Sequence, residues 1–357
     1  MTTRREIVKA GAGLAAIIAA GKAPAAFVRS LVAGRNAMMA GDSKPTPAYW
    51  GLCFTAEEPG VVVNMVRNST PSNVVTLETS FDGASWSYFD PNGGTTPVTL
   101  SNIGDRVYFR AGTGGNSSIA QNASRYRMFT FSKKCKASGN IMSILDGSNQ
   151  NNLSITAPYC FSWLFRGASL LTSAPEFPAT SLSSHCYNRM FFGCESLTKQ
   201  PDLPAMSVPE SAYSAMFMNC YNMVQALASL PAMVLGKGCY ANMYQGTAIK
   251  KAPILPATNL AQNCYSAMFY KCANLTTVPE LPAVTLQTAS YNAMFKDCAS
   301  LSDLTVQMTD FAGACTYWLE NTSPTGTFRC PVALGTNETI TRGTSACPVG
   351  WTVVNTD

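Results

Sequence analysis

Residues 186–205 read Cys-Tyr-Asn-Arg-Met-Phe-Phe-Gly-Cys-Glu-Ser-Leu-Thr-Lys-Gln-Pro-Asp-Leu-Pro-Ala, and variants of this stretch recur along the chain. Successive copies begin 25 to 27 residues apart. A recurrence at a nearly fixed period predicts a solenoid, in which each unit buries its apolar face only by stacking on its neighbours. The six copies begin at Cys160, Cys186, Ala212, Cys239, Cys264 and Ser290.

Within each copy the apolar residues follow the spacing of one helical face. In the second copy they are separated by 4, 1, 3, 1 and 3 residues, from Leu182 to Cys194, which predicts a short amphipathic helix. Pro201 and Pro204 lack N–H groups and therefore limit the strand that follows the helix to about four residues before Pro201. The sequence predicts an α/β solenoid over residues 138–305, followed by an irregular C-terminal cap over residues 306–357.

The thirteen cysteines lie mostly in two columns of the repeat, where small residues replace them one at a time. A disulfide partner would have to disappear with each replacement, so we expect compact buried thiols. Outside the columns, Cys330 and Cys347 are the best candidates for a disulfide. The chain has no Cys-x-x-Cys motif and a single histidine, His185, so we expect no metal and no cofactor.

Two further columns of the repeat are aromatic. They run from Phe161 through Tyr187 to Tyr291, and from Phe165 through Phe191 to Phe295. A stripe of this kind can bind sugars, but its spacing favours packing in the core.

The cysteine- and proline-rich pattern resembles BspA-type leucine-rich repeats of surface proteins of gut Bacteroidales and of proteins of their phages. The motif Cys-Tyr-x-x-Met-Phe at 186–191 and 264–269 carries the resemblance, together with Leu-Pro-Ala at 203–205, 255–257 and 281–283. The ending Ser-Pro-Thr-Gly-Thr-Phe at 323–328 and Gly-Trp-Thr-Val-Val at 350–354 extends it over about residues 140–357. The resemblance implies attachment to host surfaces or partner proteins without catalysis, and it transfers no binding residues.

Residues 46–137 alternate short β-rich runs with turn signals such as Asp82-Gly83. Seven short runs, of which all but the last begin 9 to 13 residues after the one before, predict a small antiparallel β-sandwich. Its aromatic residues Trp86, Tyr88, Tyr108 and Phe109 are interpreted as packing rather than as a ligand platform. The seven runs are 49–54, 61–66, 74–80, 86–89, 97–100, 106–110 and 127–132.

Residues 1–45 hold seven basic and two acidic side chains and therefore account for the whole net charge of +5. The body is neutral, which gives no reason to expect a nucleic-acid partner. Two interpretations of the segment stay open. One is a Gly/Ala-rich helical arm that docks on an assembly, and the other is a twin-arginine export signal cleaved after Ala25. The candidate docking residues are Arg4, Arg5, Ile7, Leu14, Ile17 and Ile18.

No catalytic constellation is apparent, because a Ser-His or Cys-His pair could use only His185, and Gly112-Thr113-Gly114-Gly115 lacks the lysine of a phosphate loop. We therefore expect a non-enzymatic display protein. It is either a phage virion fibre or decoration protein on the virion surface, or an exported bacterial adhesin at the cell surface. The expected partners are the virion or cell envelope through the arm and a host protein or glycan through the repeats. The sequence is compatible with a homo-oligomer and does not specify the oligomeric state.

The predicted recognition surface follows from the variation between copies. The two residues after the fixed Leu vary freely, while the flanking columns keep their chemistry. Because adjacent strand residues alternate faces, one residue of each pair is expected to point outward. The alternative is that this row is only a solvated surface without a ligand. Recognition would then fall to the loop Gly112 to Asn116 or to the region around Trp318 and Trp351. The candidate ligand-facing residues are Lys199, Gln225, Lys250, Lys251, Thr277 and Asp303.

Overall fold

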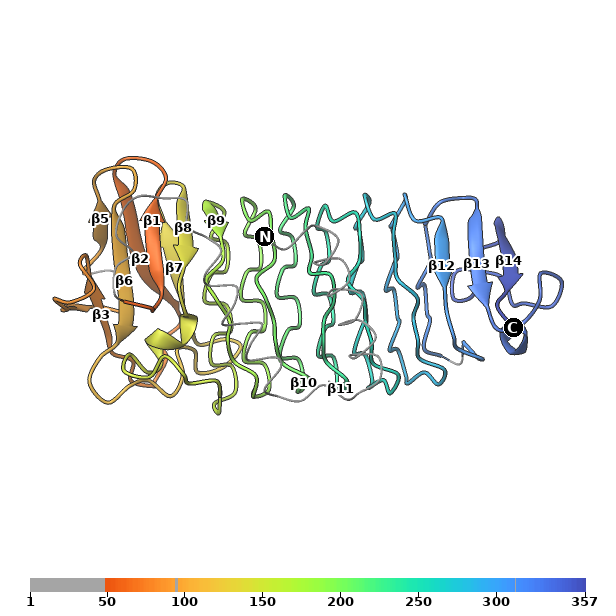
Figure 1. Ribbon diagram of the computed structural model, residues 1–357, viewed down its shortest axis with the longest axis horizontal. Coiled ribbons are helices and arrows are strands. Elements are labelled where there is room, and N and C mark those ends of the chain that lie inside the picture. The colour runs from red at the N-terminus through yellow and green to blue at the C-terminus, as the bar shows by residue number, and fades with distance from the viewer. Residues whose placement is uncertain (1–48, 94–95, 312) are drawn as a thin grey trace, which may run out of the picture. The chain divides into compact units, whose positions relative to one another are not determined.

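A computed structural model describes residues 49–93, 96–311 and 313–357, which belong to one compact unit (Figure 1). The unit is mostly β, with antiparallel sheets first and a β-solenoid of about six turns after them. No α-helix occurs among these residues, whose only helical turns are two short 3-10 segments, η1 (Ile141–Ile144) and η2 (Val332–Leu334). The predicted N-terminal arm, with Arg4, Arg5, Ile7, Leu14, Ile17 and Ile18, lies outside the described residues.

The N-terminal part contains all seven predicted strands and an eighth that was not predicted. One sheet has the order β4-β3-β6-β1-β8-β9 and the other the order β5-β2-β7. All pairs are antiparallel except β8 with β9. The strands are β1 (Cys53–Ala56), β2 (Val61–Asn68), β3 (Leu77–Ser80), β4 (Ser87–Phe89), β5 (Val98–Leu100), β6 (Arg106–Ala111), β7 (Tyr126–Phe131), β8 (Cys135–Ser138) and β9 (Leu171–Ser173).

The two sheets pack through aromatic rings. Phe54 of β1 meets Phe129 of β7 edge-on at 4.9 Å between centroids, and Phe109 of β6 meets Phe129 at 5.1 Å. The same core continues into the solenoid, because Phe129 stacks on Phe165 at 5.7 Å and β8 pairs with β9 of the first turn. The sandwich therefore caps the first turn, and the further turns follow in a row toward the C-terminus (Figure 1).

The segments predicted as repeat helices are ribbons of consecutive β-turns. In the second turn, the amide of Met190 donates to Tyr187 O and that of Cys194 to Phe191 O, which closes i to i−3 turns at 3.2 and 3.0 Å. The intervening amides donate to the next copy, as Phe191 N does to Met216 O at 2.9 Å. One amide therefore donates within its own β-turn and the next donates to the neighbouring copy. These second bonds link successive copies through the backbone.

Every fourth residue of the ribbon has a left-handed backbone. In the second copy these residues are His185, Arg189 and Gly193, with φ of 58°, 54° and 73°. The apolar pairs between them point inward with a period of four residues. Over eight residues this differs from the helical period of 3.6 by less than about one residue, so the spacing alone could not separate the two. The prediction of α-helices, and with it the α/β leucine-rich repeat, is wrong.

The strands of the solenoid are short and parallel. They are β10 (Ser207–Val208), β11 (Val234–Leu235), β12 (Asp303–Thr305), β13 (Gly326–Cys330) and β14 (Trp351–Asn355). The turn ribbon continues beyond residue 305, since Phe295 N donates to Trp318 O at 2.8 Å. The segment predicted as an irregular cap therefore extends the stack and ends on β13 and β14.

Candidate functional site

The six predicted ligand-facing residues all lie on the surface. Lys199, Gln225, Lys250, Lys251, Thr277 and Asp303 are exposed. Parallel bridges join Lys199 to Gln225 and Lys251 to Thr277 in neighbouring turns. Asp303 forms an ion pair with Arg329 of β13 at 2.5 Å. The residues therefore lie at the same corner of successive turns of the solenoid, which we call the variable edge.

The geometry of the variable edge differs from the prediction in one respect. Both residues of the pairs 198–199, 224–225, 250–251, 276–277 and 302–303 are exposed, whereas one was expected to point inward. The chain bends here instead of running as a flat strand, because Val224 N and Gln225 N both donate to the same carbonyl, Thr198 O, at 3.1 and 3.3 Å. The variable edge is consequently wider than one residue per turn.

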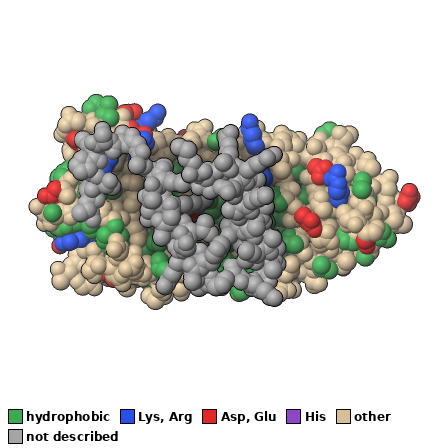
Figure 2. Space-filling view, in the orientation of Figure 1, with side chains coloured by type: hydrophobic (Ala, Val, Ile, Leu, Met, Phe, Trp, Pro, Cys, Tyr) green, Lys and Arg blue, Asp and Glu red, His purple; other side chains and the backbone are tan. Residues whose placement is uncertain are grey.

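Charge on the solenoid surface is sparse. In Figure 2 the Lys, Arg, Asp and Glu side chains of the face shown stand singly or in small groups among polar and apolar ones. One basic and aromatic group lies near the sandwich, where Arg166 and Arg189 approach the Trp163 ring to 4.8 and 5.0 Å. Among the described side chains that the view leaves uncovered, no extended patch of one sign is seen.

The cysteines are buried free thiols, as the column argument predicted. Burial raises the pKa of Cys220 to about 12 and that of Cys186 well above its ordinary value. Several donate to a carbonyl of the previous turn, for example Cys194 Sγ to Phe165 O at 3.0 Å. Cys330 and Cys347 are also free, so the proposed disulfide between them is absent.

The single histidine of the chain, His185, belongs to the turn ribbon of the second copy. His185 stacks on Tyr159 with a centroid distance of 4.5 Å, and burial lowers its pKa. The adjacent Cys186 thiol has a raised pKa, whereas activation of a nucleophile requires a lowered one. Among residues 49–93, 96–311 and 313–357, no cluster of three or more His, Cys, Asp or Glu side chains could hold a metal ion.

Both aromatic columns are buried stacks, as expected for packing. Neighbouring rings of the first column lie 5.6 to 6.2 Å apart between centroids, and Trp318 closes it. Trp351 is 2% exposed, and its Nε1 donates to Ser323 O at 2.8 Å. Trp318 and Trp351 therefore cap the core and offer no surface for recognition.

The sandwich aromatics divide between core and surface. Phe109 is fully buried and Tyr108 nearly so, whereas Tyr88 is 63% exposed. Trp86 is partly exposed and lies under the guanidinium of Arg110, at 4.1 Å from the ring centroid. Packing explains Phe109 and Tyr108, and the packing interpretation fails for Tyr88.

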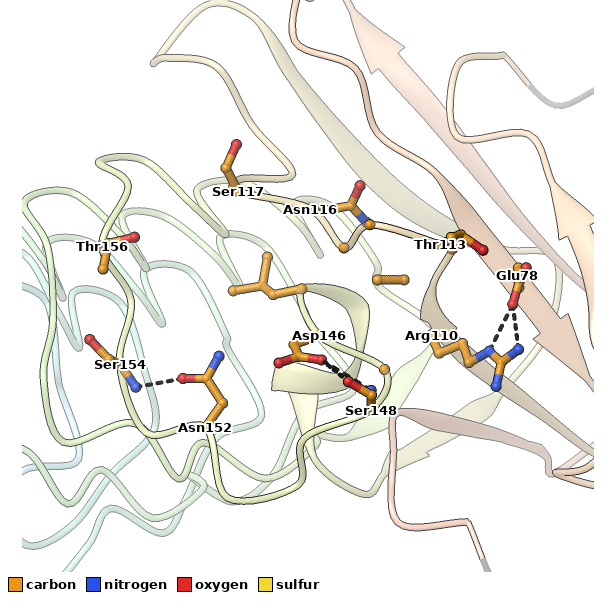
Figure 3. A pocket seen from close by; sticks show the side chains of 16 residues that line it. Glu78, Arg110, Thr113, Asn116, Ser117, Asp146, Ser148, Asn152, Ser154 and Thr156 are labelled. Atoms are coloured by element: carbon orange, nitrogen blue, oxygen red, sulfur yellow. Dashed lines mark hydrogen bonds and ion pairs between the residues drawn. The ribbon is translucent and has the colours of Figure 1, made fainter.

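A cavity of about 740 Å³ lies where the sandwich meets the first turn of the solenoid (Figure 3). Three pieces of chain line it, namely Glu78 with Arg110 from β3 and β6, the loop 111–117, and residues of the segment 145–156. Asn116 holds the loop in place, because its Nδ2 donates to Thr76 O and Ile144 O at 2.8 Å. We call this feature the junction pocket.

Glycine lets the backbone pieces of the junction pocket approach one another. A Cβ on Gly115 would lie 2.8 Å from Leu145 O, and one on Gly147 would lie 2.9 Å from Arg110 Cβ.

The sequence had singled out Gly112 to Asn116 as a loop, but nothing in it indicated that segment 145–156 would lie opposite this loop. The signal available was the glycine and Asn/Ser content of both segments, which marks turns without pairing them.

Comparisons with protein-family models, with curated proteins and with solved structures find no match for this chain. Among the described residues, no helix combines the length and the apolar character needed to cross a bilayer. The solenoid predicted from the repeats is present, and the family behind the resemblance is not identified by these comparisons.

Proposed function

We propose that this chain is a non-enzymatic attachment protein. The observation that carries the proposal is the contrast between the buried and the exposed positions of the solenoid repeat. Its cysteines and its two aromatic columns are consumed by packing, while the variable edge changes chemistry at each turn and stays exposed. A stacked scaffold with a freely varying surface row suits recognition of a partner, because substitutions there leave the core untouched.

The form we favour is a phage virion fibre or decoration protein that docks by residues 1–45 and presents the solenoid to a host surface. The twin arginines Arg4 and Arg5 and the small residues around Ala25 support a second candidate, an exported bacterial adhesin. Intact-mass analysis of the native protein separates the two. A start at Met1 or Thr2 supports the docked arm, and a start at Ala26 supports export.

The variable edge is tested by replacing Lys199, Lys250 and Lys251 together with Ser. Because all three side chains are exposed, we expect the free energy of unfolding to change by less than about 0.5 kcal/mol. Attachment to host cells should fall if the variable edge carries recognition. Unchanged attachment at unchanged stability moves the binding surface elsewhere in the chain.

A further inference from the structure

The junction pocket carries hydrogen-bonding groups that the protein itself leaves unused. Asp146 accepts hydrogen bonds from Ser148 N and Oγ on Oδ1 only, at 3.1 and 2.7 Å. Asn152 accepts one from Ser154 N on Oδ1 at 3.1 Å. Within the described chain, Asp146 Oδ2 and Asn152 Nδ2 take no partner. Figure 3 places Asp146, Asn152 and Ser154 on one side of the space and Thr113 and Ser117 on the other.

The lining selects for a particular kind of ligand. Hydroxyl, amide and carboxylate groups dominate it, and Leu145 and Ala111 are the apolar members. A ligand that displaces water here must replace many hydrogen bonds at once, because each polar group left unpaired costs affinity. A polyhydroxylated molecule can do so and a mainly apolar one cannot.

The charged side chains of the lining restrict the class of ligand further. The guanidinium of Arg110 is already paired with Glu78, with Nε and Nη2 each 2.7 Å from Oε2. The remaining charge of the lining is the carboxylate of Asp146, which disfavours a phosphate, sulfate or carboxylate group in the pocket. The lining therefore fits a neutral ligand better than an anionic one.

An exposed aromatic ring adjoins this lining. In the register of the sheet, Tyr88 of β4 lies directly opposite Glu78 of β3, and Glu78 lies opposite Arg110 of β6. Directly opposed residues on one face have Cβ atoms about 5 Å apart. Tyr88 is thus the cross-strand neighbour of a pocket residue, and its exposed ring adds an aromatic group beside the polar lining.

We infer that the junction pocket binds a neutral oligosaccharide. The inference rests on the proposed attachment function and adds the ligand class and a second surface, distinct from the variable edge. The loop is preorganised for binding, since Gly112 N donates to Thr76 O at 3.0 Å and Asn116 N to Leu145 O at 2.8 Å. Little ordering remains to be done when a ligand arrives.

The test exchanges donor and acceptor without changing charge. In the double variant Asp146→Asn, Asn152→Asp, each side chain keeps the acceptor used by its own turn, while the free oxygen and the free amide swap places. The full chain is screened on an array of neutral oligosaccharides and their sialylated and sulfated counterparts. The best neutral binder is then titrated by calorimetry. Asp297→Asn, Asn321→Asp is the matched control: it makes the same exchange at a pair outside the pocket and the variable edge, where Asn321 Nδ2 donates to Asp297 Oδ1 at 2.7 Å.

We expect the full chain to bind neutral members of the array and the pocket variant to bind about tenfold more weakly or worse, with an unchanged melting temperature. The control variant should bind as the native chain does. Binding only to acidic glycans, equal loss in the control, or a protease-sensitive cell receptor with no array signal would each overturn the inference.

Cell attachment separates this inference from the proposed function. Attachment that is lost in the triple Lys variant and kept in the pocket variant, with no neutral glycan of the array bound, overturns the inference and leaves the attachment function standing. Glycan binding through the pocket by a protein that attaches to no cell surface overturns the attachment function and leaves the inference.

Discussion

The sandwich and the solenoid bury similar residues by different means. In the sandwich, rings from two sheets meet edge-on, as Phe54 and Phe129 do at an interplanar angle of 67°. In the solenoid, each ring lies parallel to its copy in the next turn, as Phe269 and Phe295 do at 2°. The sandwich core joins segments distant in sequence, whereas each solenoid turn rests on its two neighbours. We therefore expect a core substitution in the sandwich to destabilise both sheets, and one in the solenoid to destabilise only the neighbouring turns.

The largest effect is expected from removing one ring in each region. Phe217 and Phe109 are both fully buried, so Phe217→Ala and Phe109→Ala should each cost about 3–5 kcal/mol of unfolding free energy. Hydrogen exchange should then show loss of protection confined to the turns beside Phe217 in the first variant and across both sheets in the second. Equal spreading in the two variants would contradict the comparison.

Buried polar groups provide the next contrast. Arg127 is 1% exposed and makes five hydrogen bonds to oxygens of Asn73, Asn92 and Ile119. Arg127→Met leaves these oxygens without their donors and should cost about 3 kcal/mol. In the solenoid, the buried Tyr187 hydroxyl has no hydrogen-bond partner among the described residues, so Tyr187→Phe should be neutral or slightly stabilising. Urea unfolding measures both, and a reversed order would be evidence against this ranking.

The left-handed positions test the turn ribbon itself. Ala215 has a φ of 51°, which a β-branched side chain strongly disfavours. Ala215→Val should therefore destabilise by about 1–3 kcal/mol, and Ala215→Gly should be neutral or slightly stabilising. Thr99→Val, at an exposed strand position of the sandwich, is the matched control and should be neutral. A tolerated valine at Ala215 would restore the helical interpretation.

The thiols give the smallest expected change. Cys272 donates to Tyr244 O at 3.0 Å, so Cys272→Ala should cost about 1–2 kcal/mol, and Cys53→Ala of the sandwich somewhat less. All thirteen cysteines should react with a thiol reagent after unfolding without reductant. A denatured protein with few reactive thiols would show that the columns are oxidised.

The same thiols set a pH dependence. Burial raises the pKa of Cys160 and Cys264 from 9.0 to about 12 in the folded chain. The unfolded chain therefore releases these protons first as the pH rises. The stability that neutral thiols contribute is complete below pH 9 and is lost between 9 and about 12. Thermal melting between pH 7 and 10 should show the decline, and a flat profile would contradict it.

The sequence by itself determined the solenoid, the antiparallel sheets and the buried columns, because a repeated apolar pattern forces neighbouring copies to share a core. It did not determine the backbone within each turn, since apolar spacing over eight residues fits a helix and a β-turn ribbon alike. One column held a signal, because it is rich in the residues that accept a left-handed backbone. Its members are Gly167, Gly193, Asn219, Gly246, Lys271, Asp297 and Asn321.

Only the tertiary structure decided where the junction pocket lies. Its walls come from β3 and β6, the loop 111–117 and the segment 145–156, which share no motif and no period. The pairing of β8 with β9 docks the sandwich on the first turn and thereby brings these segments together. Local propensity marks each as a turn, but the contact between them depends on packing between distant residues, which a pattern of residue types along one chain does not record.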